Sequence, residues 1–440
     1  MSIERLGNGL GDSLGLSLTW ESQKLINLQK HEVGADDRRV LRELAKRVAE
    51  LAARPIEDKK RKLWYAHNAL ESVRPLVFCD PENGWYEIIP HTSLKCSGSL
   101  ARIWEFGLRK EIFWGEKMGD DRVTDGGFAV QYVFSQSGRG LEQTIIGGEN
   151  DGAYTWDPPL KDYKALDDLS FSRIEVDKTK TNSLFELAAE IFEGILPIRL
   201  EGCWWWSLGM TFDAISLIGA EKIMTDMYDC PDGLHRLMAF LRDENLAKLD
   251  YLEKNGYLTQ NNKGTYVGSG GFGWTVELPQ KDFDGKNTRT LDMWGFGESQ
   301  ETVGVSPDMF EEFVFLYQLP LLEKFGLNCY GCCEALDKRW RMIEKTPRLR
   351  RVSVSNWAKE EAMGEQLCGN YIYSRKAPSA SIAIPVIDKD QIKKGLRNTL
   401  DISRRNGCVL EIIMKDNHTI GHNPQNVVDW CKIAQQEAQL

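Results

Sequence analysis

The sequence predicts a (β/α)8 TIM barrel preceded by a helical N-terminal extension. Short apolar runs alternate with amphipathic segments of helix length from about residue 75 onward, and eight such runs match the strand count of a barrel. No internal repeat or proline-rich linker divides this region. A length of 440 residues also admits two or three domains. The simpler interpretation is a single barrel with an insertion, formed by residues 71–440, and an N-terminal extension formed by residues 1–70.

The N-terminal extension is predicted to contain an arm and two helices. Residues 1 to about 20 are rich in Gly and Ser and lack periodicity, which is typical of a loosely ordered arm. Apolar residues recur at helical spacing between Val40 and Leu51. A second helix is expected over Lys60–Ser72, because the residues just before Pro75 disfavour helical conformation.

The barrel region carries the predicted strands and crossover helices. The segment from about 86 to 168 is rich in Gly, Asp and Trp and is interpreted as an insertion with its own hairpins. Ser306 is expected to cap a helix that begins with Pro307. The expected strands are Pro75–Cys79, Phe128–Phe134, Pro197–Cys203, Thr265–Gly268, Gly326–Tyr330, Arg351–Ser355, Gln366–Asn370 and Cys408–Met414, and the clearest expected helices are Ser183–Glu193, Asp213–Met227, Pro231–Asn255, Pro307–Lys324 and Lys389–Asn406.

Composition excludes several classes of protein. With 55 basic and 65 acidic residues, the net charge is −10, which argues against binding to nucleic acid phosphates or to an anionic membrane surface. No apolar run approaches the roughly 18 residues of a spanning helix, and the N-terminus lacks the pattern of a secretory signal. The sequence therefore predicts a cytoplasmic protein whose ten cysteines are reduced thiols.

The strongest local signal is a cluster of thiols after an apolar run. Cys329, Cys332 and Cys333 fall within five residues, at the predicted carboxyl end of a strand, where functional groups of parallel α/β folds collect. Thiolates and imidazole suit Zn²⁺, and a catalytic zinc takes about three protein ligands. Cys332 and Cys333 are the candidate ligands, whereas Cys329 lies within the strand and is interpreted as packing.

The end of the last predicted strand supplies partners for these thiols. His418 follows that strand in a polar loop, and Asp416 lies beside it, so both are candidate metal ligands. The only C-x-x-C motif, Cys329 to Cys332, has no second pair at zinc-finger spacing. A closed structural zinc site is therefore not expected, and a thioredoxin-like dithiol is disfavoured because that motif begins a helix.

Other motifs point to a binding pocket. Gly268–Gly273 matches G-x-G-x-x-G but runs into Trp274 and Glu277 instead of a helix, which favours a loop at a strand end over a dinucleotide site. Trp274 and Glu277 are then pocket residues. Arg375 and Lys376 follow a predicted strand and would pair with an anionic group, with a solvated surface pair as the alternative. The sequence holds no P-loop, no G-x-S-x-G and no H-E-x-x-H.

Several further motifs occur together between about residues 70 and 440. They are Leu278-Pro279, Trp294-Gly-Phe, Glu298-Ser-Gln300-Glu301-Thr, Ser306-Pro307, Tyr330-Gly-Cys332-Cys333-Glu334, Ser374-Arg375-Lys376 and Lys415-Asp416-Asn-His418-Thr419, together with the helix-like segment Ile215–Met224. This set resembles the uroporphyrinogen decarboxylase-like superfamily. Within that superfamily the chain is more similar to the cobalamin-dependent methyltransferases, because it lacks the Arg-Gln-Ala-Gly-Arg motif of the decarboxylases.

The resemblance implies the substrate-specific methyltransferase of a corrinoid-dependent demethylation system. A methyl group would pass from a small methylated substrate to a corrinoid on a partner protein, with Zn²⁺ as the Lewis acid. The family holds zinc through a His-x-Cys strand end and a late cysteine, where this chain has Cys332, Cys333 and His418 instead. Fourteen tryptophans favour an aromatic methyl ether as the substrate, and hence O-demethylation. Candidate catalytic residues are Glu277, Glu334, Glu411 and Lys415, and Tyr330 joins Trp274, Arg375 and Lys376 as a substrate-binding candidate.

Two alternatives remain open at this point. One is a uroporphyrinogen decarboxylase-like lyase that acts on a carboxylated substrate, which would need several pocket arginines and no metal. The other is a non-catalytic barrel that binds a corrinoid or a partner. The sequence also leaves open whether the chain forms a homodimer.

Overall fold

The core of the molecule is a six-stranded parallel sheet. The computed structural model describes residues 28, 31–141, 144–147 and 154–440, so most of the predicted N-terminal arm lies outside the described residues. The strand order is β1-β12-β11-β10-β9-β8, and every ladder is parallel. The bounds are β1 Leu76–Cys79, β8 Trp294–Gly297, β9 Leu327–Tyr330, β10 Leu349–Val354, β11 Ile372–Ala377 and β12 Val409–Met414.

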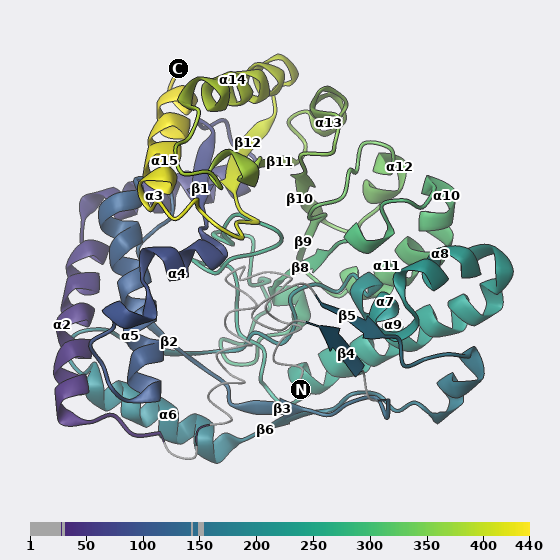
Figure 1. The fold of residues 1–440 in the computed structure, drawn as a ribbon, viewed down its shortest axis with the longest axis horizontal. Coiled ribbons are helices and arrows are strands. Elements are labelled where there is room, and N and C mark those ends of the chain that lie inside the picture. The colour runs from purple at the N-terminus through teal and green to yellow at the C-terminus, as the bar shows by residue number, and fades with distance from the viewer. Residues whose placement is uncertain (1–27, 29–30, 142–143, 148–153) are drawn as a thin grey trace.

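These strands form because they are short runs buried on both faces. All residues of β1, β8 and β9 are buried, as expected for parallel strands covered by helices. Because every ladder is parallel, the carboxyl ends of all six strands lie at one edge of the sheet. The helices that follow β8 to β12 in the chain lie outside the sheet in Figure 1. These helices are α10 Pro307–Phe310, α11 Leu316–Leu322, α12 Trp340–Ile343, α13 Glu360–Leu367, α14 Lys389–Asn406 and α15 Gln425–Ala438.

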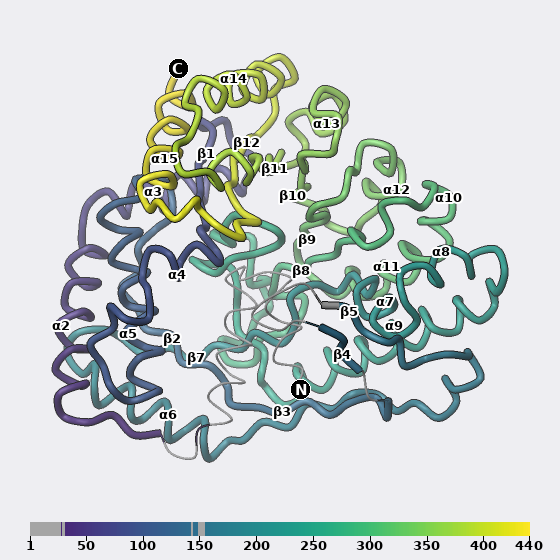
Figure 2. The backbone as a smooth tube through the Cα atoms, viewed as in Figure 1, coloured from purple at the N-terminus to yellow at the C-terminus, as the bar shows by residue number. Residues whose placement is uncertain are grey.

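Two further parallel strands form a separate pair. β2 (Phe128–Gln131) pairs with β7 (Ile198–Glu201), on the side of the molecule where the N-terminal helices lie (Figure 2). Within the described ranges, no ladder joins β1 to β2 or β7 to β8. The described residues therefore contain eight strands in parallel ladders and have the α/β class that was predicted, but hydrogen-bonded closure into a barrel is not confirmed.

The segment between α9 (Pro231–Lys254) and β8 spans one of these breaks with side-chain contacts. Thr259 Oγ1 accepts a hydrogen bond from Gly202 N (3.2 Å), just beyond β7. The Asn261 amide bonds to both backbone groups of Trp294 (2.8 and 3.0 Å), at the start of β8. Side chains thus replace the missing strand ladder.

The predicted glycine loop lies against the side chains of the six-stranded sheet. A Cβ at Gly268, whose φ is +68°, would lie 2.7 Å from the Cβ of Cys329 in β9. A Cβ at Gly271, whose φ is +84°, would lie 2.8 Å from a Glu411 oxygen in β12. Glycine is required here because the loop backbone packs directly on the sheet.

The N-terminal helices pack on the β2–β7 side. α2 (Ala35–Ala52) contributes Leu41, Ala45 and Val48 to a core that it shares with α5 (Ser99–Phe113) and α6 (Lys178–Ile191). The remaining elements connect these layers. They are α3 Pro55–Asn68, α4 Trp85–Ile88, α7 Thr211–Ile218, α8 Ala220–Asp229, and the antiparallel pairs β3 (Phe134–Gln136) with β6 (Ile174–Val176) and β4 (Thr144–Gly147) with β5 (Tyr154–Asp157).

Several predicted elements differ from those observed. Gln366–Asn370 is not a strand, because α13 continues to Leu367 with Met363 and Leu367 buried one turn apart. Thr265–Gly268 forms only an isolated bridge between Tyr266 and Phe272, and β8 was not predicted. The expected helix 213–227 is divided at Gly219, whose φ is +88°.

Other predicted features are confirmed. Helix α14 has the predicted bounds, and α9 begins at Pro231. Ser306 Oγ accepts a hydrogen bond from Met309 N and caps α10. Among the described residues, no helix has the length and apolarity needed to cross a membrane.

Candidate active site

Two adjacent thiols and a lysine converge at the carboxyl edge of the sheet. Cys332 and Cys333 follow β9, and their sulfur atoms are 3.5 Å apart. Lys415 and Asp416 follow β12, with Lys415 Nζ 3.8 Å from Cys332 Sγ and 2.8 Å from Asp416 Oδ1. Ser269 Oγ, from the glycine loop, lies 3.2 Å from Cys332 Sγ. We refer to these five residues as the thiol–lysine cluster.

The turn after β9 fixes the thiols. Gly331, with a φ of +91°, turns the chain directly after the strand, and its N–H bonds to the carbonyl of Gly297 (2.9 Å). The Glu334 carboxylate then accepts hydrogen bonds from Cys332 N (2.8 Å) and Ser299 N (2.8 Å). Both of its oxygens thus hold backbone groups of the turns after β8 and β9, and the predicted catalytic role of Glu334 stays a prediction.

The charges in the cluster are mutually dependent. The hydrogen bond from Cys333 lowers the pKa of Cys332, and Lys415 lowers it further, although burial opposes both. The pKa of Cys333 is raised by its bond to Cys332 and by burial. Burial lowers the pKa of Lys415, but Cys332 and Asp416 raise it well above its ordinary value. The arrangement therefore stabilises one thiolate, one thiol and one buried ammonium.

Glu82, which sequence reasoning missed, lies beside this cluster. Burial raises its pKa well above the ordinary value, Lys415 lowers it in part, and Asp416 raises it. Its Oε2 accepts a hydrogen bond from Asn417 N (2.8 Å), while its buried Oε1 has no partner among the described residues. Burial thus favours the neutral form of the Glu82 carboxyl group, and one of its oxygens has no partner among the described residues. Its place just after β1, at the carboxyl edge, was the signal that could have identified it.

A second buried carboxyl group, Glu298, follows β8. Burial and the neighbouring Glu301 raise its pKa well above the ordinary value. Unlike Glu82, it is engaged at both oxygens, by Ser207 Oγ (3.1 Å) and Gln300 N (3.0 Å). Glu298 therefore has less capacity to act on a ligand.

The predicted acid Glu411 belongs to a different group of residues. It lies within β12 and pairs with Arg351 Nε (2.9 Å), His67 Nε2 (3.0 Å) and Ser374 Oγ (2.5 Å). Burial would raise its pKa, but Arg351, His67 and Lys376 lower it to about 2. This pairing favours the ionised form of Glu411 and a structural role, and its predicted role as a proton donor stays a prediction.

Lys376 completes this second group. Its Nζ donates a hydrogen bond to Ser374 Oγ (2.7 Å). Burial lowers its pKa to about 8, with Glu411 acting in the opposite direction. Lys376 therefore lies on the same face of the sheet as Ser374 and Glu411, where the charges of both Glu411 and Lys415 act on it. We refer to Glu411, Arg351, His67, Ser374 and Lys376 as the Glu411 network.

Four predicted site residues lie elsewhere. Glu277 is exposed and pairs with Arg350 (2.5 Å) near the start of β10, at the opposite edge of the sheet. Trp274 is also at that side, packed on Tyr65 of α3. The remaining two, Arg375 and Tyr330, point to the outer face because side chains alternate along a strand: Arg375 Nη2 pairs with Glu360 of α13 (2.9 Å), and Tyr330 Oη donates to Gln318 of α11 (2.5 Å).

The predicted zinc ligands do not form a suitable set. Cys332, Cys333 and Asp416 are near one another, but His418 is exposed. The Lys415 ammonium, bonded to Asp416 and close to Cys332, already places a positive charge among these groups. In the part of the chain that the structure describes, no group of three or more His, Cys, Asp or Glu is arranged to hold a metal ion. We therefore assign no chemical step to zinc.

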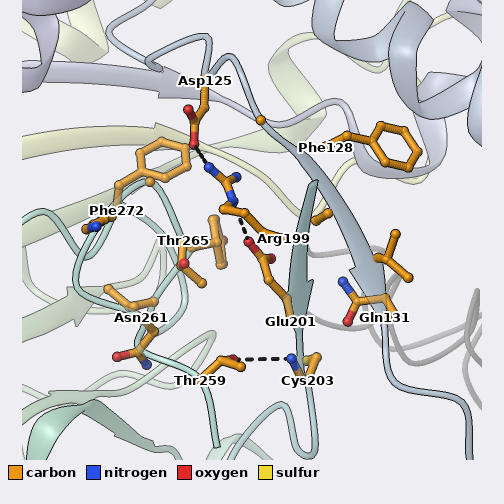
Figure 3. Close-up of a pocket in the computed structure, with 18 of the residues that line it drawn as sticks. Asp125, Phe128, Gln131, Arg199, Glu201, Cys203, Thr259, Asn261, Thr265 and Phe272 are labelled. Atoms are coloured by element: carbon orange, nitrogen blue, oxygen red, sulfur yellow. Dashed lines mark hydrogen bonds and ion pairs between the residues drawn. The ribbon is translucent and has the colours of Figure 1, made fainter. Parts of the chain in front are cut away.

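A cavity lies beside the β2–β7 pair. Its volume is about 550 Å³, and it is bounded by both strands and by the segment 259–268 (Figure 3). Arg199 of β7 pairs there with Asp125 (2.5 Å) and Glu201 (3.2 Å). The aromatic residues of the lining include Trp204, Trp205, Trp206, Trp294 and Phe296.

Comparisons with known proteins give limited information. No protein-family model matches the chain. A search of curated proteins likewise finds no match. Among solved structures, a methyltransferase from Methanosarcina mazei matches with a TM-score of 0.48 and 11% sequence identity, over 86% of this chain and 98% of that one. A likeness of this extent establishes neither family nor activity.

Proposed function

We propose that the chain is a methyltransferase that moves a methyl group from a small methylated substrate to a corrinoid held by a separate protein. The observation that carries this proposal is the buried Lys415 amino group, 3.8 Å from Cys332 Sγ, together with the buried Glu82 carboxyl group, whose Oε1 has no partner among the described residues. The resemblance of the motifs over residues 70 to 440 to the uroporphyrinogen decarboxylase-like superfamily, without the Arg-Gln-Ala-Gly-Arg motif of its decarboxylases, also supports it.

The reaction needs stabilisation of the group that loses the methyl. When the acceptor takes the methyl carbon, the bonding electron pair remains on the substrate heteroatom. A preorganised ammonium stabilises such a developing negative charge, and the Cys332 thiolate and Asp416 keep Lys415 protonated for this task. Lys415 thus supplies the positive charge that the sequence analysis assigned to zinc.

The leaving group also needs a proton. Glu82 is suited to donate it, because burial raises the pKa of its carboxyl group and its Oε1 has no partner among the described residues. Proton transfer to the heteroatom leaves a demethylated product and a Glu82 carboxylate beside Lys415. The ammonium then stabilises that carboxylate until solvent restores the proton.

The test is a methyl-transfer assay with free cob(I)alamin as the acceptor. The protein is incubated anaerobically with a panel of methyl ethers, methyl thioethers and methylamines, and formation of methylcobalamin is followed by absorbance. We expect one class of donors to react. Glu82→Gln should lower that rate by about 10²- to 10⁴-fold, because it removes the proton donor while conserving shape.

The matched control is Glu186→Gln, which neutralises an exposed glutamate and should not change the rate. Two outcomes would overturn the proposal. One is no methylcobalamin from any donor, and the other is release of CO2 from a set of aromatic and aliphatic polycarboxylates assayed in parallel, which would identify a lyase.

A further inference from the structure

The thiol–lysine cluster has a buried side and an accessible side. Cys332 and Lys415 are buried, with 2% and 3% of each residue exposed. Cys333 is only partly buried, and 42% of the Asp416 side chain is exposed. A molecule that approaches the carboxyl edge of the sheet therefore meets the sulfur of Cys333 before that of Cys332.

The two sulfur atoms differ in the groups that contact them. Ser269 Oγ (3.2 Å) and Lys415 Nζ (3.8 Å) both donate toward Cys332 Sγ, and these contacts favour a negative charge on that sulfur. Cys333 Sγ lies 3.5 Å from Cys332 Sγ and donates toward Asp416 Oδ2 (3.7 Å). The proton of Cys333 thus has two acceptors within reach. An accessible thiol beside such a base is the arrangement of an activated nucleophile.

The surroundings of the thiols suit a reaction at carbon. Cys333 and Trp206 pack at the border of an apolar cluster that includes Phe296, Cys329 and Cys332. The Trp206 ring lies edge-on to that of Phe296, with 5.5 Å between the centroids. Apolar side chains replace part of the water around a thiolate, and a thiolate is intrinsically a strong nucleophile toward carbon.

We infer that Cys333 carries the methyl group between the donor and the corrinoid, as an S-methylcysteine intermediate. The donor and the corrinoid come from the proposed function, on which this inference rests. Cys333 is then a catalytic residue, Cys332 is the base that activates it, and Lys415 holds the negative charge on Cys332 until the donor arrives.

The first half of the reaction loads Cys333. Its proton passes to the Cys332 sulfur, and the Cys333 sulfur attacks the methyl carbon of the donor. A sulfur–carbon bond forms while the bond between that carbon and the donor heteroatom breaks. The electron pair of the broken bond stays on the heteroatom, which takes its proton from Glu82 as in the proposed reaction.

The second half unloads Cys333. The methyl group passes from the Cys333 sulfur to the reduced corrinoid, a cobalt–carbon bond replaces the sulfur–carbon bond, and the electron pair of the latter returns to sulfur. Cys333 regains its proton from Cys332, and Glu82 regains its proton from solvent. The sum is donor, cob(I)alamin and a proton giving demethylated product and methylcobalamin, so no further oxidant or reductant is needed.

The test runs the second half in reverse, with methylcobalamin as the probe and no methyl donor. The full-length protein is incubated anaerobically, release of cob(I)alamin is followed by absorbance, and the methylated residue is located by mass spectrometry of peptides. We expect up to one methyl group per protein, on Cys333. Cys332→Ser should still be methylated on Cys333 but about 10²-fold more slowly, because the base is lost.

Two matched cysteines control for the general reactivity of thiols. Cys333→Ser should take up no methyl group, whereas Cys230→Ser, which alters another partly buried cysteine, should be methylated as the wild type is. Absence of methyl uptake by the wild-type protein, uptake on Cys332, or uptake on Cys230 at the same rate as on Cys333 would overturn the inference. These three outcomes are read from proteins with an intact Cys333, so they do not depend on the folding of Cys333→Ser.

The donor assay separates this inference from the proposed function. If Cys333→Ser forms methylcobalamin from a donor at the wild-type rate, the methyl group passes directly to the corrinoid, so the relay is overturned and the proposed function stands. If Cys333 takes up a methyl group from methylcobalamin but no donor in the panel reacts, the proposed function fails and Cys333 is still a methyl acceptor.

Discussion

Two buried groups of charged residues involve β12, one from within the strand and one from the residues that follow it, and they differ in the contacts of their carboxyl groups. In the Glu411 network, the carboxylate is paired with Arg351, His67 and Ser374 at 2.5 to 3.0 Å. In the thiol–lysine cluster, the contacts between the thiols, Ser269 and Lys415 are 3.2 to 3.8 Å. Beside that cluster, Glu82 Oε1 and Tyr266 Oη have no partner among the described residues.

This difference separates a structural role from a chemical one. Complete pairing holds Glu411 in a single charge state, with a pKa of about 2, and leaves it nothing to offer a ligand. The His67 ring fits the same account: its Nε2 donates to Glu411, so its unpartnered Nδ1 is the unprotonated nitrogen. Glu82 Oε1, beside the thiol–lysine cluster, has no partner among the described residues and retains the capacity to bind a ligand, which is typical of active sites.

The largest expected effect comes from removing the charge of Lys415. Lys415→Met should lower methyl transfer by about 10²- to 10³-fold, since it removes the only ammonium that contacts both Cys332 and Asp416 in the described chain. Transfer to cob(I)alamin measures the effect. Lys281→Met, at an exposed position, is the control. Activity within a few-fold of wild type would show that Lys415 does not act at the reacting atoms.

Removing a charge from the Glu411 network should affect folding instead. Arg351→Met leaves the Glu411 carboxylate buried with fewer partners, and we expect the free energy of unfolding to fall by about 3–5 kcal/mol. Urea denaturation measures this loss. Methyl transfer per folded molecule should stay within a few-fold of wild type. A rate loss as large as that of Lys415→Met, with an unchanged free energy of unfolding, would show that the Glu411 network also has a chemical role.

A smaller effect is expected from the pH dependence of Lys376. Its pKa of about 8 in the folded chain lies below the ordinary value of 10.5. Between these values the unfolded chain binds a proton that the folded chain does not, so Lys376 makes folding more favourable as pH rises from about 8 to 10.5. The free energy of unfolding of wild type minus that of Lys376→Met should therefore rise with pH, by at most about 1.4 kcal/mol per unit.

Urea denaturation of both proteins at pH 7, 8, 9 and 10 tests this. Below pH 8 the difference should be flat. A difference that falls with rising pH would mean that the pKa of Lys376 is raised in the folded chain, as for Lys415, and would place it with the thiol–lysine cluster.

Strand ends were predictable from the sequence, but the face on which each side chain lies was less so. Apolar runs identified β1, β9 and β12, and therefore placed Cys332 and Lys415 at one edge. The sequence did not predict β8, and it predicted a strand at 366–370 instead of β11. The alternation of side chains along β11, which turns Arg375 outward and Lys376 inward, was therefore not recognised. One residue of register decides such an assignment.

Partners distant in sequence account for the other errors. Glu411 could not be recognised as fully paired, because His67 lies 344 residues before it on α3. Glu82 gives no local signal of a raised pKa, which comes from burial in the folded chain. The cavity was also unpredictable, since it exists where β2 and β7 separate from the main sheet.

The smallest effect is expected from Glu277→Gln, which tests whether the reaction site extends to the amino edge of the sheet. The glutamate is exposed, and its ion pair with Arg350 is at the amino edge of the sheet. Exposed ion pairs contribute little, so Glu277→Gln should change the free energy of unfolding by less than about 0.5 kcal/mol and leave methyl transfer unchanged. Urea denaturation and the cob(I)alamin assay measure both. A rate loss comparable to that of Glu82→Gln would move the reaction to the opposite edge of the sheet, away from Lys415.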